Sequence, residues 1–151
     1  MATMTLESEI PERCLCFDAR RTSRLITRVY EQFLEPSGLT ATQRGAMKFV
    51  EDRGALSIAE LATLLDLDRT SLRRLLDPLE RDGHITVVAG TDRRTRLVSL
   101  TEHGKTILGV SDQYWQQAQR KMLEMLGENH WRSLTTLMHS TRKIIHSRDS
   151  V

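Results

Sequence analysis

The chain of 151 residues has no apolar run long enough to span a membrane. Its first residues, MATMTLESEIPER, include acidic side chains and lack the apolar core of a signal peptide. These two absences predict a cytoplasmic protein with no membrane partner.

Cysteine is also scarce, because only Cys14 and Cys16 are present. On a helix, side chains two positions apart point to nearly opposite faces, so an internal disulfide is not expected. A reduced state, as in the cytoplasm, is therefore the expected one.

Patterns for metal binding and catalysis are missing as well. The five histidines are scattered and lack a metal-ligand spacing such as H-E-x-x-H. There is no glycine-rich loop for phosphates and no nucleophile elbow. We therefore expect no metal, no cofactor and no enzymatic activity.

What the chain does contain is helical periodicity at both ends. Apolar residues recur at helical spacing from Pro11 to Leu34, and Pro11 suits the first turn of a helix. A long helix is expected to begin at Thr101 and to end at Gly127, and a last helix carries Trp131 and Ile144. These helices enclose a middle region with shorter elements.

The middle region, 57–104, organises the chain. Ser57 with Glu60 forms the pattern of a capping box that opens a short helix. Asp68 then suits the cap of a second helix, which has leucines on one side. Its other side is polar and carries Thr70, Arg73, Arg74, Asp77 and Arg81.

Two β-branched segments, 84–88 and 96–100, follow and flank a polar turn, so they predict a hairpin. The expected fold is mainly α with a small β-hairpin wing: a winged helix-turn-helix on a helical dimerisation stalk. We expect a single domain over 1–151. Its winged part covers 40–100, and its dimerisation helices cover 10–35 and 101–148.

Positive charge gathers in this region. Seven arginines against four acidic residues between positions 69 and 96 leave +3, which exceeds the +2 of the whole chain. An arginine-rich helix face suits the major groove of double-stranded DNA, and arginines at a hairpin tip suit a narrow minor groove. The candidate DNA-binding residues are Ser57, Arg69, Thr70, Ser71, Arg73, Arg74, Arg93, Arg94 and Arg96. One alternative is a charged face that meets only solvent. Another is a helical protein-interaction module that keeps the winged shape without binding DNA.

A longer pattern supports the DNA interpretation. The residues Asp92, Arg94, Val98, Leu100, Thr101 and Gly104 give D-x-R-x-x-x-V-x-L-T-x-x-G. This pattern, with GLTATQ at 38–43, resembles the MarR (multiple antibiotic resistance regulator) family, and the resemblance extends from about Arg13 onward. It implies a homodimeric transcription regulator on pseudo-palindromic DNA, usually a repressor released by a small ligand or by oxidation. Arg94 would be the wing arginine, and Asp92 would pair with it and orient it.

The homodimer has a second argument. The terminal helices carry apolar residues that a small winged core cannot cover, and such surfaces usually mark interfaces. They include Phe17, Trp131, Ile144 and Ile145. A two-fold dimer would hold its two arginine-rich helices one DNA turn apart, ~34–36 Å. A small-molecule effector would bind between the first, second and fifth helices.

Cys14-Leu15-Cys16-Phe17 resembles a segment of the organic-hydroperoxide-sensing branch of the same family. Cys16 would hold the reactive position, and Tyr30 matches one supporting tyrosine. Ala41 and Arg20, however, stand where that branch has further tyrosines. The arginines that follow Cys16 favour a thiolate, which supports a redox-sensing alternative. The other interpretation is that Cys16 is a small buried residue at a dimer interface.

Overall fold

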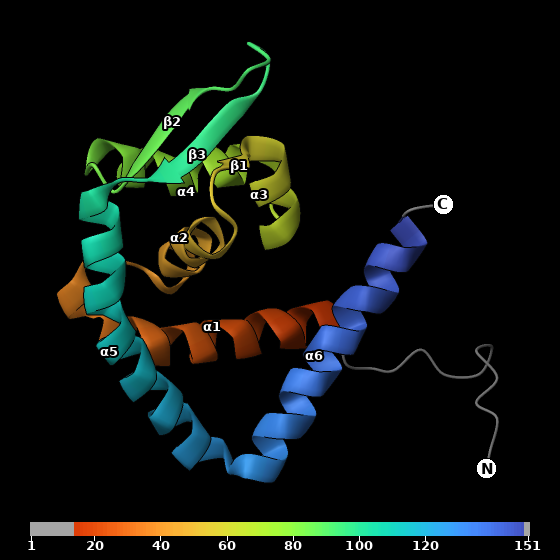
Figure 1. The fold of residues 1–151 in the computed structure, drawn as a ribbon. Coiled ribbons are helices and arrows are strands. Elements are labelled where there is room, and N and C mark those ends of the chain that lie inside the picture. The colour runs from red at the N-terminus through yellow and green to blue at the C-terminus, as the bar shows by residue number, and fades with distance from the viewer. Residues whose placement is uncertain (1–13, 150–151) are drawn as a thin grey trace.

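The computed structural model describes residues 14–149, which form six α-helices, one 3-10 turn and three strands (Figure 1). In chain order they are α1 (Leu15–Leu34), η1 (Glu35–Ser37), α2 (Ala41–Arg53), β1 (Leu56–Ser57), α3 (Ile58–Leu65), α4 (Arg69–Arg81), β2 (Ile85–Ala89), β3 (Arg96–Leu100), α5 (Glu102–Leu126) and α6 (Glu128–Asp149). The predicted fold class, a mainly helical winged helix-turn-helix, is confirmed. None of the helices within 14–149 is both long and apolar enough to cross a membrane.

The helix starts follow the predicted caps. The Thr40 hydroxyl accepts a hydrogen bond from the backbone N–H of Gln43 at 3.1 Å, and the Gln43 side chain accepts one from Thr40 at 2.9 Å. Ser57 and Glu60 form the same reciprocal pair at 3.1 and 2.8 Å. Each capping box satisfies two N–H groups that a helix start leaves without partners.

The first helix begins later than the sequence pattern predicts. Cys14 is extended, with φ −73° and ψ 110°, and the helix starts at Leu15. Pro11, the predicted first-turn residue, lies outside the described residues.

The sheet has three antiparallel strands in the order β1-β3-β2. Val98 of β3 is at its centre, where it pairs with Leu56 on one side and Val87 on the other. The predicted hairpin is confirmed, with its first strand shifted by one residue to Ile85–Ala89. The third strand, β1, was not predicted, because two residues carry no alternation of their own.

The hydrophobic core lies in the segment 41–100, which we call the winged lobe. Leu61 of α3, Leu72 of α4 and Val98 of β3 are fully buried there. From outside the lobe, Leu39, and Leu108 of α5, also belong to this core. The lobe therefore has its own interior, and α5 is packed into it at one end.

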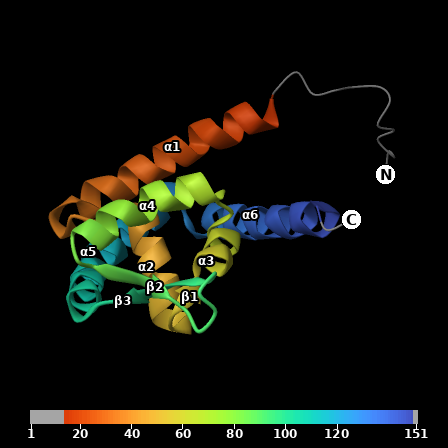
Figure 2. The same cartoon turned by 90° about the horizontal axis from the view of Figure 1, so that it is seen from above.

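The other long helices, α1, α5 and α6, are called the stalk helices below. In Figure 1, α5 and α6 form a V that turns at Gly127, and α1 crosses between its arms beneath the winged lobe. Seen from above, α1 and α6 extend beyond the lobe (Figure 2). Within the described part of the chain, α1 buries only Leu34 and α6 buries no residue. Large apolar side chains on these helices, among them Phe17, Leu137 and Ile144, are consequently exposed.

A close contact joins the lobe to α5. The Thr101 hydroxyl donates to the Gly83 carbonyl at 2.6 Å and accepts from the N–H of Gly104 at 2.9 Å. A Cβ atom built on Gly104 would lie 1.9 Å from the backbone oxygen of His84. Glycine at this position therefore lets the first turn of α5 approach the start of β2, which is a physical reason for the Thr-x-x-Gly pattern.

Gly104→Ala should lower stability, because the added methyl group meets backbone rather than a flexible side chain. We expect a loss of about 1–3 kcal/mol, the usual cost of overpacking. Gly109→Ala in the same helix is the matched control, because its Cβ meets nothing within 4 Å. Alanine there should be neutral or stabilising by up to about 1 kcal/mol. Denaturant unfolding measures both, and equal stabilities of the two variants would contradict the packing argument.

Candidate nucleic-acid interface

The turn between α3 and α4 is fixed by local bonds. Asp66 takes the left-handed conformation, with φ 53° and ψ 40°, and so ends α3. Asp68 then caps α4, because its carboxylate accepts from the Ser71 N–H at 2.8 Å. This bond lowers the pKa of Asp68, so the carboxylate is ionised where the helix N-terminus favours negative charge. The predicted turn and cap are both present.

α4 has two different faces. Leu72, Leu76 and Leu79 are buried in the core of the winged lobe. The exposed face carries Arg69, Thr70, Arg73 and Arg74. The Arg73 side chain is 83% exposed and lies 3.8 Å from Asp77, and such an exposed pair contributes only ~0–1 kcal/mol. The guanidinium groups of this face are therefore available to an external partner.

The two candidate serines have structural duties. Ser57 caps α3 with its hydroxyl, as described above. The Ser71 hydroxyl donates to the second carboxylate oxygen of Asp68 at 2.8 Å. Both hydroxyls thus stabilise the helix-turn-helix. The Ser57 hydroxyl accepts in its bond and can still donate its proton to a ligand, whereas the Ser71 hydroxyl already donates to Asp68.

The hairpin tip carries Arg93 and Arg94, both exposed. Asp92 accepts from the backbone N–H of Arg94 at 3.1 Å, and no ion pair of Asp92 occurs among the residues described. Asp92 therefore shapes the turn that presents Arg94, whereas the sequence predicted a pair with the guanidinium. The Thr95 N–H donates to the Asp92 carbonyl at 2.9 Å and closes the same turn.

Arg96, the last candidate arginine, is turned back onto its own hairpin. Its guanidinium donates to the carbonyl of Val87 on β2 at 3.1 Å. This bond joins the two strands near the base of the tip. Arg96 therefore supports the hairpin, while the tip arginines remain free of the sheet. Figure 1 shows α4 and this hairpin at the end of the molecule opposite the α5–α6 turn.

The cysteines lie away from this end, at the start of α1, and both are exposed. Tyr30 is fourteen residues after Cys16 on the same helix, a distance of about 21 Å at 1.5 Å per residue. Its hydroxyl donates a hydrogen bond to Gln119 of α5. Burial raises the pKa of Tyr30. Within one chain, therefore, Tyr30 cannot support a thiolate at Cys16.

A hollow of about 480 Å³ lies beside the end of α1, the η1 turn and the start of α2. It is lined by Arg28, Glu31, Gln32, Glu35, Gly38, Leu39 and Thr40. The hollow thus touches the first and second helices, two of the three between which an effector was expected. The hollow is open to solvent, and its lining combines Leu39 with the charged residues Arg28, Glu31 and Glu35.

Histidine contributes one local cluster. The rings of His84 and His103 stack with their centroids 5.0 Å apart. Burial lowers the pKa of His84, and the charge of His103 lowers it further. Among residues 14–149, no group of three or more His, Cys, Asp or Glu side chains could hold a metal ion. The pair therefore belongs to the contact between β2 and α5.

Sequence reasoning missed the polar contacts between the winged lobe and the stalk helices. Arg44 of α2 bonds to Asp112 of α5 at 2.5 Å, and His146 of α6 lies 2.6 Å from Asp66 in the helix-turn-helix. The partners are far apart in the sequence, so no local sequence pattern predicts these contacts. One signal was present for Arg44, because it lies three residues before the buried Met47 and so shares its helix face.

Comparison with known proteins gives a consistent result. A sequence model of the MarR family matches residues 37–95. The transcriptional activatory protein BadR of Rhodopseudomonas palustris is 30% identical over 135 residues, which cover 87% of this chain and 76% of that protein. The organic hydroperoxide resistance transcriptional regulator of Bacillus subtilis is 32% identical over 114 residues, which cover 68% and 78%.

A solved structure of the transcriptional regulator MosR of M. tuberculosis in complex with DNA superimposes with a TM-score of 0.75 and 29% identity. The match covers 87% of this chain and 98% of that one, so it includes the stalk helices as well as the winged lobe. The chain belongs to the MarR family of winged helix-turn-helix transcription regulators.

Proposed function

We propose that the chain forms a homodimer that binds a pseudo-palindromic site in double-stranded DNA and so regulates transcription. One observation carries the proposal. The exposed arginine face of α4 is held by a buried leucine face, at the same end of the molecule as the arginine-tipped hairpin (Figure 1). The likeness to MosR, a regulator solved in complex with DNA, supports it.

In this proposal α4 enters the major groove. Thr70, Arg73 and Arg74 face the base edges, where a guanidinium can form two hydrogen bonds with guanine. Arg69, in the first turn, meets a phosphate through its guanidinium, because the Asp68 carboxylate already caps the helix start. Ser57 and Ser71 keep the two helices in position for these contacts.

The hairpin serves the adjacent minor groove. Arg94, with Arg93, enters a narrow groove whose negative potential attracts arginine. Asp92 positions Arg94 through the backbone of the turn, and Arg96 stiffens the hairpin through Val87. The wing therefore adds affinity by charge, while α4 selects the sequence.

The homodimer would form through the stalk helices. Their exposed large apolar side chains are Leu15, Phe17, Leu25, Val110, Leu123, Met125, Leu137, Met138, Ile144 and Ile145. Exposed apolar surface on this scale is unfavourable in water and usually marks an interface. Packing two copies through these faces would cover it and pair the two winged lobes.

We infer repression as the mode of action, because a bound dimer occludes the DNA that it covers, although the R. palustris relative is named as an activator. The hollow beside Glu31 is our proposed effector site. Relatives with transcription-regulator names support a regulator rather than an enzyme. Such a protein would work in the cytoplasm, where its DNA is.

Arg94→Ala should weaken binding to DNA with little loss of fold, because the side chain is exposed and unbonded to the sheet. A mobility shift across a salt series measures this, and the slope of affinity against salt should decrease by about one phosphate-equivalent charge. Unchanged affinity would refute the wing assignment. If the unmutated protein shows no salt-dependent shift on any DNA, the interaction-module alternative is favoured instead.

Arg74→Ala should change the sequence preference of DNA binding, whereas Arg93→Ala should change the overall affinity. Selection of bound DNA from a random pool gives the site, and its symmetry tests the dimer. Loss of Arg74 should then relax the preference at one position by about 1–3 kcal/mol, since a base contact is lost. Loss of Arg93 should weaken all sequences alike. If both variants weaken selected and random DNA equally, α4 does not recognise bases through Arg74.

Thiol-based sensing is the second candidate function. The exposure of both cysteines favours it, as does the likeness to a B. subtilis regulator named for organic hydroperoxide resistance. A thiolate at Cys16 would take one oxygen from the peroxide, becoming a sulfenic acid and releasing the alcohol. Tyr30 could assist only from a second copy, because it is bonded to Gln119 and distant along α1.

Cumene hydroperoxide should then lower the affinity of the reduced protein for its selected site, by tenfold or more if oxidation is coupled to release. Cys16→Ser should abolish this response, and Cys14→Ser, the matched control, should retain it. An unmutated protein that binds DNA equally well before and after treatment excludes the sensing function.

A further inference from the structure

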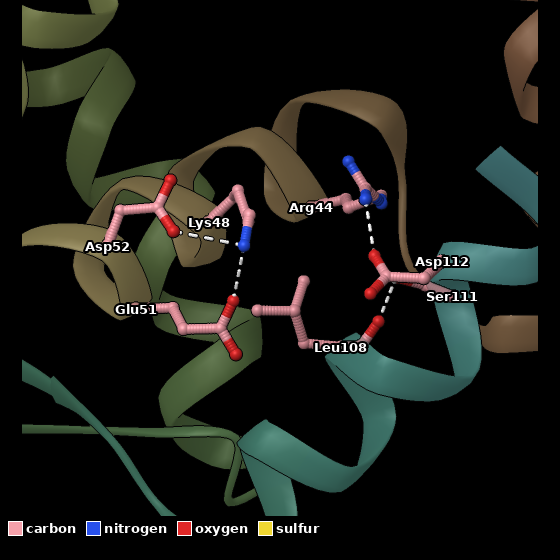
Figure 3. Close-up of polar contacts among 7 residues, drawn as sticks. All are labelled: Arg44, Lys48, Glu51, Asp52, Leu108, Ser111 and Asp112. Carbon is pink, nitrogen blue, oxygen red and sulfur yellow. Dashed lines mark hydrogen bonds and ion pairs between the residues drawn. The ribbon is translucent and has the colours of Figure 1, made fainter. Parts of the chain in front are cut away.

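Arg44 is a buried charge at the boundary between the winged lobe and the stalk helices. It is 8% exposed on α2, and its Nη2 atom lies 2.5 Å from the Asp112 carboxylate of α5 (Figure 3). The guanidinium carbon lies 4.5 Å from the centre of the Trp115 ring. Its Nε atom is buried and has no hydrogen-bond partner within the described chain. An apolar side chain at position 44 could fill this space without leaving a buried donor unpaired. The packing of α2 therefore does not by itself explain an arginine here.

The position of this contact along α5 is informative. Leu108, before it, belongs to the core of the winged lobe. Gln119, after it, accepts a hydrogen bond from Tyr30 of α1. Asp112 and Trp115 lie between these points, so Arg44 links α2 to α5 where the helix passes from the lobe into the stalk.

Neighbouring polar groups in Figure 3 do not make the same link. Ser111 is fully buried, but its hydroxyl donates to the Leu108 carbonyl of its own helix at 2.6 Å. Lys48, one turn after Arg44 on α2, pairs with Glu51 at 2.7 Å and Asp52 at 3.0 Å, both on α2 itself. Of the two basic residues in Figure 3, Arg44 is thus the one that bonds to another helix.

The first turn of α2 is also held from the other side. Glu31 of α1 accepts a hydrogen bond from the backbone N–H of Ala41 at 2.9 Å. One end of α2 is therefore fixed to α1 by Glu31 and to α5 by Arg44. Loss of either contact would leave α2 less constrained against α1 or α5, while Gly104 and Leu108 still hold the first turns of α5 to the lobe.

We propose that Arg44, held between Asp112 and Trp115, is a positioning residue that fixes the winged lobe on α5 and so sets the half-site spacing that the dimer accepts. The consequence for DNA rests on the proposed function. A change of the preferred spacing by one base pair needs a displacement of about 3.4 Å along the DNA and a rotation of roughly 34–36° around it. Asp112 and Trp115 act on DNA only through Arg44.

The test uses the full-length protein and a panel of duplexes. Each duplex carries the selected half-site twice, at spacings up to two base pairs shorter or longer than the selected one. Asp112→Asn removes the charge but keeps the size of a side chain that is half-exposed, so it should fold. Arg44→Lys keeps the charge but loses the planar group that meets Trp115. Lys48→Met is the matched control, because it breaks pairs only within α2.

The unmutated protein and Lys48→Met should prefer one spacing. Asp112→Asn and Arg44→Lys should reduce that preference roughly 2- to 30-fold, the range of coupling between separated sites, with affinity for a single half-site unchanged. A role in stability alone would lower binding at all spacings equally. Either that uniform loss or an unchanged preference in both variants overturns the proposal.

A second measurement needs no DNA and keeps the two proposals separate. Spin labels at Thr91→Cys and Glu124→Cys, in a Cys14→Ser, Cys16→Ser background diluted with unlabelled chain, report the distance between the wing tip and the far end of α5. Asp112→Asn should broaden this distance distribution, and Lys48→Met should not. If the unmutated protein binds no duplex, the proposed function fails. A distribution that Asp112→Asn leaves unchanged overturns the role of Arg44.

Discussion

The burial of one face of α4 is the interaction on which the rest of the molecule depends. Leu72, Leu76 and Leu79 are almost fully buried, and each contributes about 1.5–3 kcal/mol relative to an exposed position. The exposed Arg73–Asp77 pair contributes ~0–1 kcal/mol. The leucines therefore determine where α4 lies, and its arginines contribute little to the stability of the fold. The exposed face of α4 is therefore positively charged, and its side chains can bind a ligand without loss of the fold.

A second constraint is that α5 packs both into the winged lobe and against the stalk helix α1. Gly104 lets its first turn lie against the start of β2, and Leu108 enters the core of the winged lobe. Further along, Gln119 bonds to α1 and the helix continues to Leu126. Because α5 is one continuous helix, it connects the contacts at the stalk end with those in the lobe. In the proposed dimer, the contacts that α5 makes with α1 and α2 would therefore set the position of α4 relative to the second copy.

The sequence predicted most of the local structure and little of what joins the parts. Thr40 with Gln43 and Ser57 with Glu60 were predictable, because both members of each pair lie within one helical turn. The burial of Arg44 was not, because its partner Asp112 is 68 residues away. The same reason applies within the candidate interface. Exposed arginines on α4 follow from helical periodicity, whereas the bond of Arg96 to Val87 depends on the register of the hairpin.

These contacts also limit what an effector can do. A ligand changes DNA binding only if it binds one arrangement of the lobe better than another. The hollow that we propose for it includes Glu31, the residue that holds the first N–H of α2. A hydrogen bond to a charged group contributes about 1.5–3 kcal/mol, so displacement of Glu31 alone could change the affinity for DNA by at most roughly 10- to 150-fold. A stronger response requires that the same movement of α2 also separates Arg44 from Asp112. The first turn of α2, held at both sides, is therefore where a small ligand would gain the most control over the spacing of the two lobes.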